Sequence, residues 1–253
     1  MTVTIAVAGK GGTGKTTFAA LVIKSLLQGK NPSILALDAD PNSNLNEALG
    51  LEVEKAISEI LEATKDPKAV PEGMSKHMFI EYMLSQAIIE TKNIDLLVMG
   101  GPQGPGCYCY PNDILKGNMD KLAPNYDYVV VDNEAGLEHI SRGTVKKVNH
   151  LFVISDGSVR GIRSAARVRE LIEALKNEID NVYLVITKIS NEEQLDTIMP
   201  EIQKTGLNFI GYIPMDEQVV EYDLHARALF DLPDDSKAVE SVKDILNKTV
   251  LNN

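Results

Sequence analysis

Short apolar runs recur along the chain, separated by longer stretches that have the spacing of helices. Most of the runs are continuous rather than alternating, which is typical of strands buried on both faces of a parallel sheet. The predicted strands are Val3–Ala8, Ser33–Leu37, Ile94–Met99, Tyr128–Val131, Leu151–Ile154, Val182–Thr187 and Asn208–Ile213. This alternation predicts an α/β fold, with one doubly wound, mostly parallel sheet of about seven strands and helices on both faces.

Residues 51–92 contain no clear strand, and a break from Pro67 to Gly73 divides them. We expect helices here, inserted between the second and third strands of a single domain that covers residues 1–253. The segment Ser236–Leu251 has apolar residues at helical spacing, at positions 239, 242, 246 and 250. This stripe predicts a last helix that docks on the core. The alternative, a membrane-targeting helix, needs aromatic anchors that the segment lacks.

Composition and charge narrow the function classes. Of the 253 residues, 44% are hydrophobic and 24% charged, as in soluble globular proteins. The 36 acidic and 25 basic residues give a net charge of −11, which argues against non-specific binding to nucleic acid or anionic membranes. No run approaches the roughly 18 apolar residues of a spanning helix, and the first residues lack the basic region of a signal peptide. We expect a cytoplasmic protein with no nucleic-acid or membrane partner.

The most specific motif follows the first predicted strand and opens the first predicted helix. It matches G-x-x-x-x-G-K-[ST], a loop whose backbone amides surround phosphate oxygens. Lys15 is expected to reach the β- and γ-phosphates, and the Thr16 hydroxyl to bind Mg²⁺. The residues predicted to bind ATP or ADP are Gly9, Lys10, Gly11, Gly12, Thr13, Gly14, Lys15, Thr16 and Thr17.

A second lysine, Lys10, directly follows the first glycine of this loop. The run from Lys10 to Thr16 fits K-G-G-x-G-K-[ST] and therefore resembles the deviant Walker A family, which includes the MinD and ParA ATPases and nitrogenase iron protein. The resemblance implies a homodimer that encloses ATP, with Lys10 crossing to the partner's phosphates. A solvated lysine beside the phosphate site is the alternative.

Three carboxylates follow predicted strands, where parallel strands of such folds meet their ligands. ATP hydrolysis needs carboxylates that orient the attacking water and hold the waters of Mg²⁺. Asp40 matches the family's first switch, so it is expected to orient the water. Asp38 and Asp132 are expected near Mg²⁺, and Asp132–Gly136 matches the D-x-x-x-G second switch. The expected catalytic residues are Lys10, Lys15 and Asp40.

The base end of the site has a weaker signal. Pro214 and Asp216 follow the last predicted strand and resemble the family's base-binding loop. Thr187 and Lys188 stand where the family usually has an asparagine. Adenine is the base that the family implies.

Two cysteines, Cys107 and Cys109, lie in a Gly/Pro-rich loop after the third predicted strand. On an extended chain they would point to one side and could share a soft metal ion. They supply two of the four ligands that tetrahedral or square-planar sites need, and a two-fold dimer could supply the others. Thiol redox chemistry and simple packing are the alternatives.

This cysteine pair, together with the run from Ala135 to Thr144, is similar to the CooC-type nickel-insertion ATPases, which mature carbon monoxide dehydrogenase and its acetyl-CoA synthase partner. The resemblance implies a dimer that holds one Ni²⁺, or Zn²⁺, through four thiolates and delivers it to a client nickel enzyme. His139 is either a metal-delivery ligand or a residue that packs behind the second switch.

A basic stripe supports a rival function. Arg160, Arg163 and Arg167 fall on one predicted helix face, with Arg169 beside them, and these are four of the six arginines. They fit a ParA- or MinD-like partition or positioning ATPase that acts on DNA or a protein partner. They equally fit a solvated or partner-docking face. An ATP-switched adaptor with incidental cysteines is a third reading.

Overall fold

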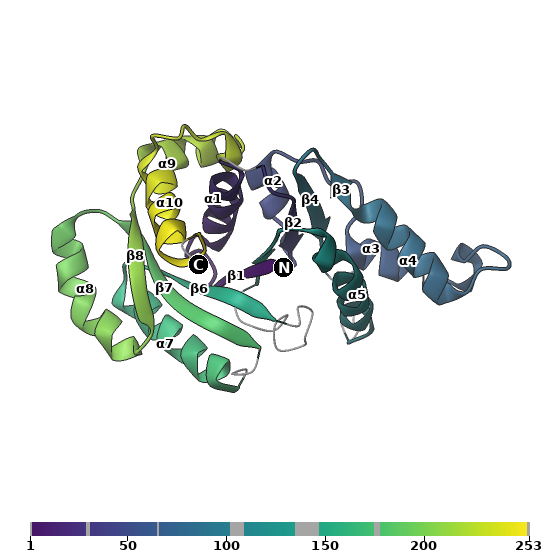
Figure 1. Ribbon diagram of the computed structural model, residues 1–253, viewed down its shortest axis with the longest axis horizontal. Helices are drawn as coiled ribbons and strands as arrows, with labels where there is room; N and C mark the ends of the chain where they lie inside the picture. The colour runs from purple at the N-terminus through teal and green to yellow at the C-terminus, as the bar shows by residue number, and fades with distance from the viewer. Residues whose placement is uncertain are drawn as a thin grey trace.

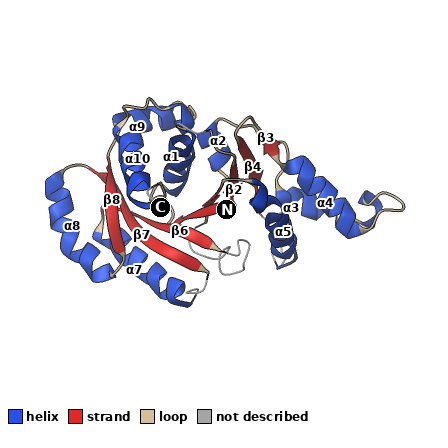
Figure 2. Cartoon of the chain, in the orientation of Figure 1, coloured by secondary structure: helices blue, strands red, loops and turns tan. Residues whose placement is uncertain are grey.

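The computed structural model describes residues 2–28, 31–64, 66–101, 109–134, 147–174 and 178–251. Its centre is an eight-stranded sheet in the order β3-β4-β2-β5-β1-β6-β7-β8 (Figures 1 and 2). The strands are β1 (Val3–Gly9), β2 (Ile34–Asp38), β3 (Ile89–Glu90), β4 (Ile94–Val98), β5 (Tyr128–Asp132), β6 (Val148–Asp156), β7 (Ile179–Ile189) and β8 (Asn208–Pro214). The described helices are α1 (Lys15–Leu27), α2 (Leu45–Leu49), α3 (Ile57–Ala63), α4 (Lys76–Ala87), α5 (Cys109–Leu122), α7 (Val159–Ala174), α8 (Glu192–Thr205), α9 (Glu217–Leu224) and α10 (Lys237–Thr249), with 3₁₀ turns η1 (Pro67–Ala69), η2 (Ala123–Asn125) and η3 (Leu229–Asp231).

The predicted α/β class and all seven predicted strands are confirmed. Every neighbouring pair of strands is parallel except β3 and β4, which are antiparallel. The short edge strand β3 lies within residues 51–92, where the sequence predicted no strand, so that expectation is wrong at this point. A strand of two residues is too short to leave a pattern, and it forms because the turn at Thr91 returns the chain along β4, with the Thr91 amide donating to the Ile94 carbonyl at 3.0 Å.

Each face of the sheet carries its own layer of helices. Alternate residues of β1 point to opposite faces: Ile5 and Val7 pack with α1, α2 and α10, and Ala6 and Ala8 pack with α3, α4, α7 and α8. In Figures 1 and 2, α1 and α10 lie on one side of the sheet and α7 and α8 on the other. The predicted docking of the last helix is confirmed: Val239, Val242 and Leu246 of α10 are fully buried, against α1 and β8.

The segment between β2 and β4 is largely helical, as expected, with α2, α3 and α4 in it. The Pro67–Gly73 break contains η1, and Ser75 then caps α4 by accepting a hydrogen bond from the Met78 amide at 3.2 Å. Within the described ranges, none of the helices has the length and apolar character needed to cross a bilayer.

Candidate functional site

The phosphate loop joins the carboxyl end of β1 to the start of α1. Gly12 and Gly14 have φ angles of +78° and +88°, a left-handed backbone that side chains with a Cβ rarely adopt. The Thr13 hydroxyl donates to the Lys10 carbonyl at 2.7 Å and closes the loop. No side chain caps the amino end of α1, so its amides are available to an anion.

A cavity of about 610 Å³ opens over this loop. Three other segments complete its wall: the loop after β2, the end of β7 and the end of β8 with α9. The predicted site residues that line it are Gly11, Gly12, Gly14, Lys15, Thr16, Thr17, Asp40, Thr187, Lys188, Pro214 and Asp216. Other residues that line the cavity were not predicted from the sequence, among them Asn42, Asn44, Val219, Val220 and Asp223. The four chain segments that contain these predicted binding residues therefore meet at one cavity.

Thr16 and Asp132 form a buried pair beside the loop. The Thr16 hydroxyl donates to one Asp132 carboxylate oxygen at 2.6 Å, and Asp132 is 1% exposed. The other carboxylate oxygen has no hydrogen-bond partner among the described residues. Burial raises the pKa of Asp132 to about 7; nearby Asp38 adds to the rise, while the Thr16 hydroxyl and Lys15 oppose it. A hydroxyl next to an unpartnered buried carboxylate fits a hydrated Mg²⁺ ion.

Asp38 shapes the loop that carries Asp40. It lies opposite Asp132 in the register of β2 and β5 and is fully buried. Its two oxygens accept from the amides of Asp40 at 3.1 Å and Leu45 at 2.9 Å. Burial raises its pKa to about 6, although these amides oppose the rise. Asp38 does not line the cavity, so its direct contribution is to hold the loop between β2 and α2.

Asp40 lines the cavity across from the phosphate loop. One of its oxygens accepts from the amide of Asn42 at 2.9 Å and from the side-chain amide of Asn42 at 3.1 Å. These bonds hold one carboxylate oxygen of Asp40 against Asn42. The water-orienting role of Asp40 remains a prediction.

The three polar side chains expected at the base end are engaged by the protein itself. The Thr187 hydroxyl donates to the Thr13 carbonyl at 2.7 Å, and Lys188 Nζ donates to the Gly12 carbonyl at 2.9 Å. Asp216 accepts from the Gln218 amide at 2.9 Å, the Ser236 hydroxyl at 2.7 Å and the Ala238 amide at 3.0 Å. Burial would raise the pKa of Asp216, but these three donors hold it below its usual range. All three side chains therefore brace the cavity wall.

Lys10 differs from the rest of the loop. It is exposed, and it does not line the cavity that Lys15 lines. Gly9 and Thr13 of the loop also do not line the cavity: Gly9 lies against β6, and the Thr13 side chain is buried. The action of Lys10 on a partner's nucleotide remains a prediction.

The cysteine pair falls mostly outside the described residues, as do Gly136, His139 and the rest of the run from Ala135 to Thr144. Cys107 is among them. Cys109 is the first residue of α5, so its backbone is helical, and the extended chain expected there is not found at this residue. In the part of the chain that the structure describes, no three His, Cys, Asp or Glu side chains gather as a metal site.

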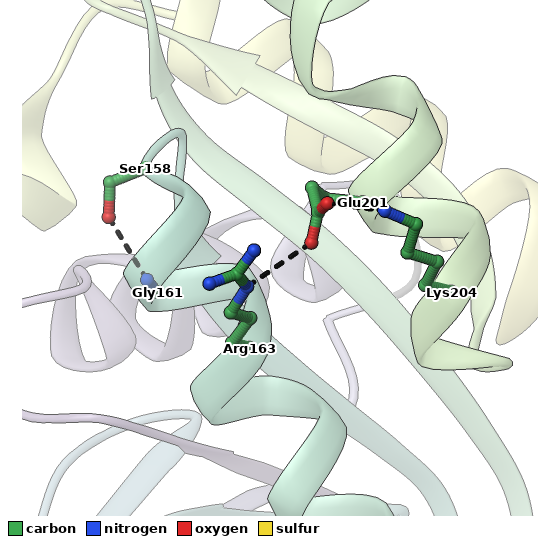
Figure 3. A network of polar contacts seen from close by, with 5 residues as sticks. All are labelled: Ser158, Gly161, Arg163, Glu201 and Lys204. Carbon is green, nitrogen blue, oxygen red and sulfur yellow. Dashed lines mark hydrogen bonds and ion pairs between the residues drawn. The ribbon is translucent and has the colours of Figure 1, made fainter.

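The predicted arginine stripe lies on α7, which packs beside α8. Arg163 Nε contacts the Glu201 carboxylate of α8 at 3.3 Å, and Lys204 binds the same carboxylate at 2.6 Å (Figure 3). In the same view, the Gly161 amide donates to the Ser158 hydroxyl at 3.0 Å and closes the first turn of α7. The Arg160 side chain is exposed and makes no hydrogen bond or ion pair with the described residues. The basic side chains are thus partly neutralised, at Arg163 by Glu201 and at Arg169 by Glu173, and unpaired at Arg160.

Comparison with known proteins agrees with this geometry. The model of the CobQ/CobB/MinD/ParA nucleotide binding domain matches residues 4–229. The chain belongs to this family. It is therefore an ATP-binding ATPase of the MinD/ParA class, and the Mg²⁺-nucleotide chemistry expected from the phosphate loop is that of the family.

Three similar proteins span almost the full chain. An uncharacterized ATP-binding protein of Methanocaldococcus jannaschii is 43% identical over 251 residues, which cover 97% of this chain and 98% of that protein. The carbon monoxide dehydrogenase accessory protein CooC of Rhodospirillum rubrum is 27% identical over 240 residues, covering 90% and 89%. The crystal structure of a ParA family ATPase from Chlorobium tepidum superposes with a TM-score of 0.73 at 18% identity, covering 96% of each chain. This last likeness shows the fold alone.

Proposed function

We propose that this ATPase is a nucleotide-gated metallochaperone. In this proposal a homodimer holds one nickel ion between the Cys107 and Cys109 thiolates of both chains and delivers it to a client enzyme, carbon monoxide dehydrogenase or acetyl-CoA synthase. The observation that carries the proposal is the C-x-C pair in a chain that is similar along 90% of its length to a carbon monoxide dehydrogenase accessory protein. Zn²⁺ is the alternative ion, because thiolates accept both metals.

The described residues supply the nucleotide half of this mechanism. Lys15 and the amino end of α1 bind the phosphates, Asp40 orients the attacking water, and Thr16 and Asp132 hold the waters of Mg²⁺. When bound, Mg²⁺ neutralises the charge of the phosphate oxygens. The exposure of Lys10 outside its own cavity supports its action on the nucleotide of a partner. ATP can move the metal only if the nucleotide states differ in metal affinity.

The test is equilibrium dialysis of the full chain against Ni²⁺, with metal analysis and mass by light scattering. It is run with and without Mg²⁺ and a non-hydrolysable ATP analogue. We expect one ion per two chains, with an affinity that changes when the analogue binds. Replacing both Cys107 and Cys109 by serine should abolish this stoichiometric binding and leave basal ATP hydrolysis intact.

Two controls make the result specific. His77→Ala and His225→Ala remove exposed imidazoles, which bind Ni²⁺ adventitiously, and should not change the stoichiometry. Lys15→Ala should remove the effect of nucleotide while the ion stays bound. One ion per dimer in the double serine variant would place the site elsewhere.

The second candidate is a partition or positioning ATPase, favoured by the unpaired Arg160 on α7. Its test is a salt-dependent shift of duplex DNA in the presence of the ATP analogue, compared with Arg160→Glu. The net charge of −11 opposes such binding. A nucleotide-dependent dimer that binds DNA and no stoichiometric metal would establish this function in place of the first.

A further inference from the structure

The chain segments that leave β2 and β4 stay in contact beyond the ends of the two strands. β2 and β4 are parallel neighbours in the sheet (Figure 1). Beyond the end of β4, the Met99 amide donates to the Asp38 carbonyl at 2.9 Å. The segment after β2 carries Asp40, and the segment after β4 leads through Gly101 to Cys107. The segment with the expected water-orienting residue and the segment with the cysteine therefore begin side by side.

Gly101 is the point of closest approach to the Asp40 segment. A Cβ on Gly101 would lie 3.1 Å from the Pro41 carbonyl oxygen and 3.8 Å from the Pro41 Cβ. Non-bonded heavy atoms are most favourable about 3.5–4.0 Å apart, so an alanine here would displace Pro41 by a few tenths of an ångström. The φ angle of Gly101 is not positive, so the backbone conformation alone does not require glycine. An alanine at this position would therefore act through the contact with Pro41.

The other side of the same segment is closed by α3. A Cβ on Gly100 would lie 2.6 Å from both the Ala56 Cβ and the Ser58 hydroxyl oxygen. The Ser58 amide also donates to the Met99 carbonyl at 2.9 Å. The backbone around Gly100 thus lies between the start of α3 and Pro41. Close-packed groups transmit a displacement to their neighbours, so an added methyl group at Gly101 should displace Pro41 rather than its own backbone.

The loop that carries Asp40 has little freedom to absorb such a displacement. Proline fixes its own φ and restricts the residue before it, which here is Asp40. The Asp40 amide donates to the Asp38 carboxylate at 3.1 Å, and the Asp40 carbonyl accepts from the amide and the hydroxyl of Ser43 at 3.0 and 3.1 Å. A shift of the Pro41 carbonyl should therefore move the Asp40 backbone and, with it, the carboxylate.

We propose that Gly101 is a positioning residue for ATP hydrolysis: its missing Cβ admits the Pro41 carbonyl and so sets the place of Asp40. Gly101 does not line the nucleotide cavity and acts only through this loop. The inference rests on the water-orienting role of Asp40 in the proposed function, and it does not rest on nickel binding. The same contact joins the loop of Asp40 to the segment that leads to Cys107.

The experiment is steady-state ATP hydrolysis by the full chain carrying Gly101→Ala, with kcat and KM determined separately. We expect kcat to fall about tenfold, because a misplacement of about 1 Å costs roughly 100-fold and the shift here is smaller. KM for ATP should stay within about twofold, because neither Gly101 nor Pro41 lines the nucleotide cavity. An unchanged kcat in the folded variant, or a raised KM with an unchanged kcat, would overturn the proposal.

The matched control is Gly211→Ala in β8. A Cβ there would lie 3.2 Å from Ile245 Cγ1, a contact about as tight as that at Gly101, and Gly211 does not line the nucleotide cavity. This variant should leave both kcat and KM unchanged. An equal fall of kcat in the control would assign the effect to loosened packing and not to Pro41.

A double variant tests whether the effect passes through Asp40. Gly101→Ala combined with Asp40→Asn should be no slower than Asp40→Asn alone, because residues that act through one group are not additive. A further fall of about tenfold would refute this route. Wild-type turnover of Asp40→Asn alone would instead overturn the role of Asp40 in the proposed function, and this inference with it. A failure of Gly101 alone leaves Asp40→Asn slow, so the two failures are distinguishable.

Thermal unfolding shows whether Gly101→Ala is folded. If it is not, Pro41→Ala tests the same contact from the other segment. This change frees φ at position 41 and should loosen Asp40, so kcat should fall about tenfold while KM stays within about twofold. A wild-type kcat in Pro41→Ala would then overturn the proposal.

Discussion

At the scale of single residues, we expect the Thr16–Asp132 pair to determine how the site responds to Mg²⁺. The carboxylate is buried, one oxygen lacks a partner among the described residues, and burial raises its pKa to about 7. The charged form therefore destabilises the metal-free fold at higher pH, and a cation relieves this cost. Asp38 is the register partner of Asp132 in the β2–β5 pair, and burial raises its pKa to about 6. Its charged form therefore also destabilises the metal-free fold.

Asp132→Asn should separate the destabilisation by the buried charge from the stabilisation by Mg²⁺. At pH 8 without metal, the variant should be more stable than wild type by about 1–3 kcal/mol, because it removes a buried charge but keeps an acceptor for Thr16. It should also lose the extra stabilisation that Mg²⁺ gives with ADP. Thermal unfolding with ADP, in EDTA and in Mg²⁺, measures both. Asp66→Asn, the same change at the exposed cap of η1, is the control. A metal-free variant less stable than wild type would contradict the argument.

At the scale of elements, local signals were sufficient for β1, the phosphate loop and α1, because the motif, the strand and the helix start lie within adjacent residues. They were insufficient for β3, with two residues, and for α9, with eight, because so few residues carry no clear period. The base end shows a different failure. Pro214 and Asp216 line the cavity. Asp216, however, binds Ser236 and Ala238, about 20 positions away, and these contacts form only when the end of β8 meets the start of α10.

The junction of β1 and β6 sets a strict requirement at Gly9. Its φ angle is +149°, and a Cβ there would come within 2.2 Å of the Ile154 carbonyl oxygen. Gly9→Ala must separate the two strands, so it should cost at least about 3 kcal/mol of unfolding free energy and lose nucleotide binding. Gly117→Ala in α5 is the control: a Cβ there meets no atom within 4 Å, and the change should stabilise the protein by about 0.5–1 kcal/mol. Urea unfolding measures the unfolding free energy of both variants. Equal changes in the two would contradict the predicted clash between a Cβ at Gly9 and the Ile154 carbonyl oxygen.

A buried histidine gives the β6–β7 pair a pH dependence. His150 is 4% exposed and stacks on Tyr183 with ring centroids 6.0 Å apart. Burial lowers its pKa, although Asp180 partly opposes this. The unfolded chain therefore takes up a proton below pH ~6.5 that the folded chain does not, so stability falls as pH falls.

His150→Phe keeps an aromatic ring and removes the proton site. The unfolding free energy of the variant should fall less steeply than that of wild type between pH 7 and pH 5, by at most about 1.4 kcal/mol per pH unit. Denaturant titrations at several pH values give this slope. His225→Phe, at an exposed position, should leave it unchanged. Parallel curves for wild type and His150→Phe would show that His150 does not titrate in this way.

At the scale of the whole molecule, the proposed dimer divides one active site between two chains. Lys15 and Asp40 line the same cavity, whereas Lys10 is exposed outside it. If Lys10 acts on the partner's nucleotide, a site contains Lys15 and Asp40 from one chain and Lys10 from the other. Two-fold symmetry then repeats this arrangement, so each chain both gives and receives a lysine.

This division predicts that two inactive variants rescue each other. Lys10→Ala and Asp40→Asn alone should each slow ATP turnover by roughly 100-fold, about 2.7 kcal/mol of barrier. Mixed in equal amounts, half of the dimers are hybrids, and each hybrid has one site with Asp40 from the first variant and Lys10 from the second. Turnover of the mixture should therefore recover to about one quarter of wild type, since half the dimers regain one of two sites. The control is a mixture of Lys15→Ala with Asp40→Asn, which share a site within one chain and cannot be exchanged by pairing, so turnover should stay low. No recovery in the first mixture, with the control also inactive, would assign Lys10 to its own chain's nucleotide and remove the shared site.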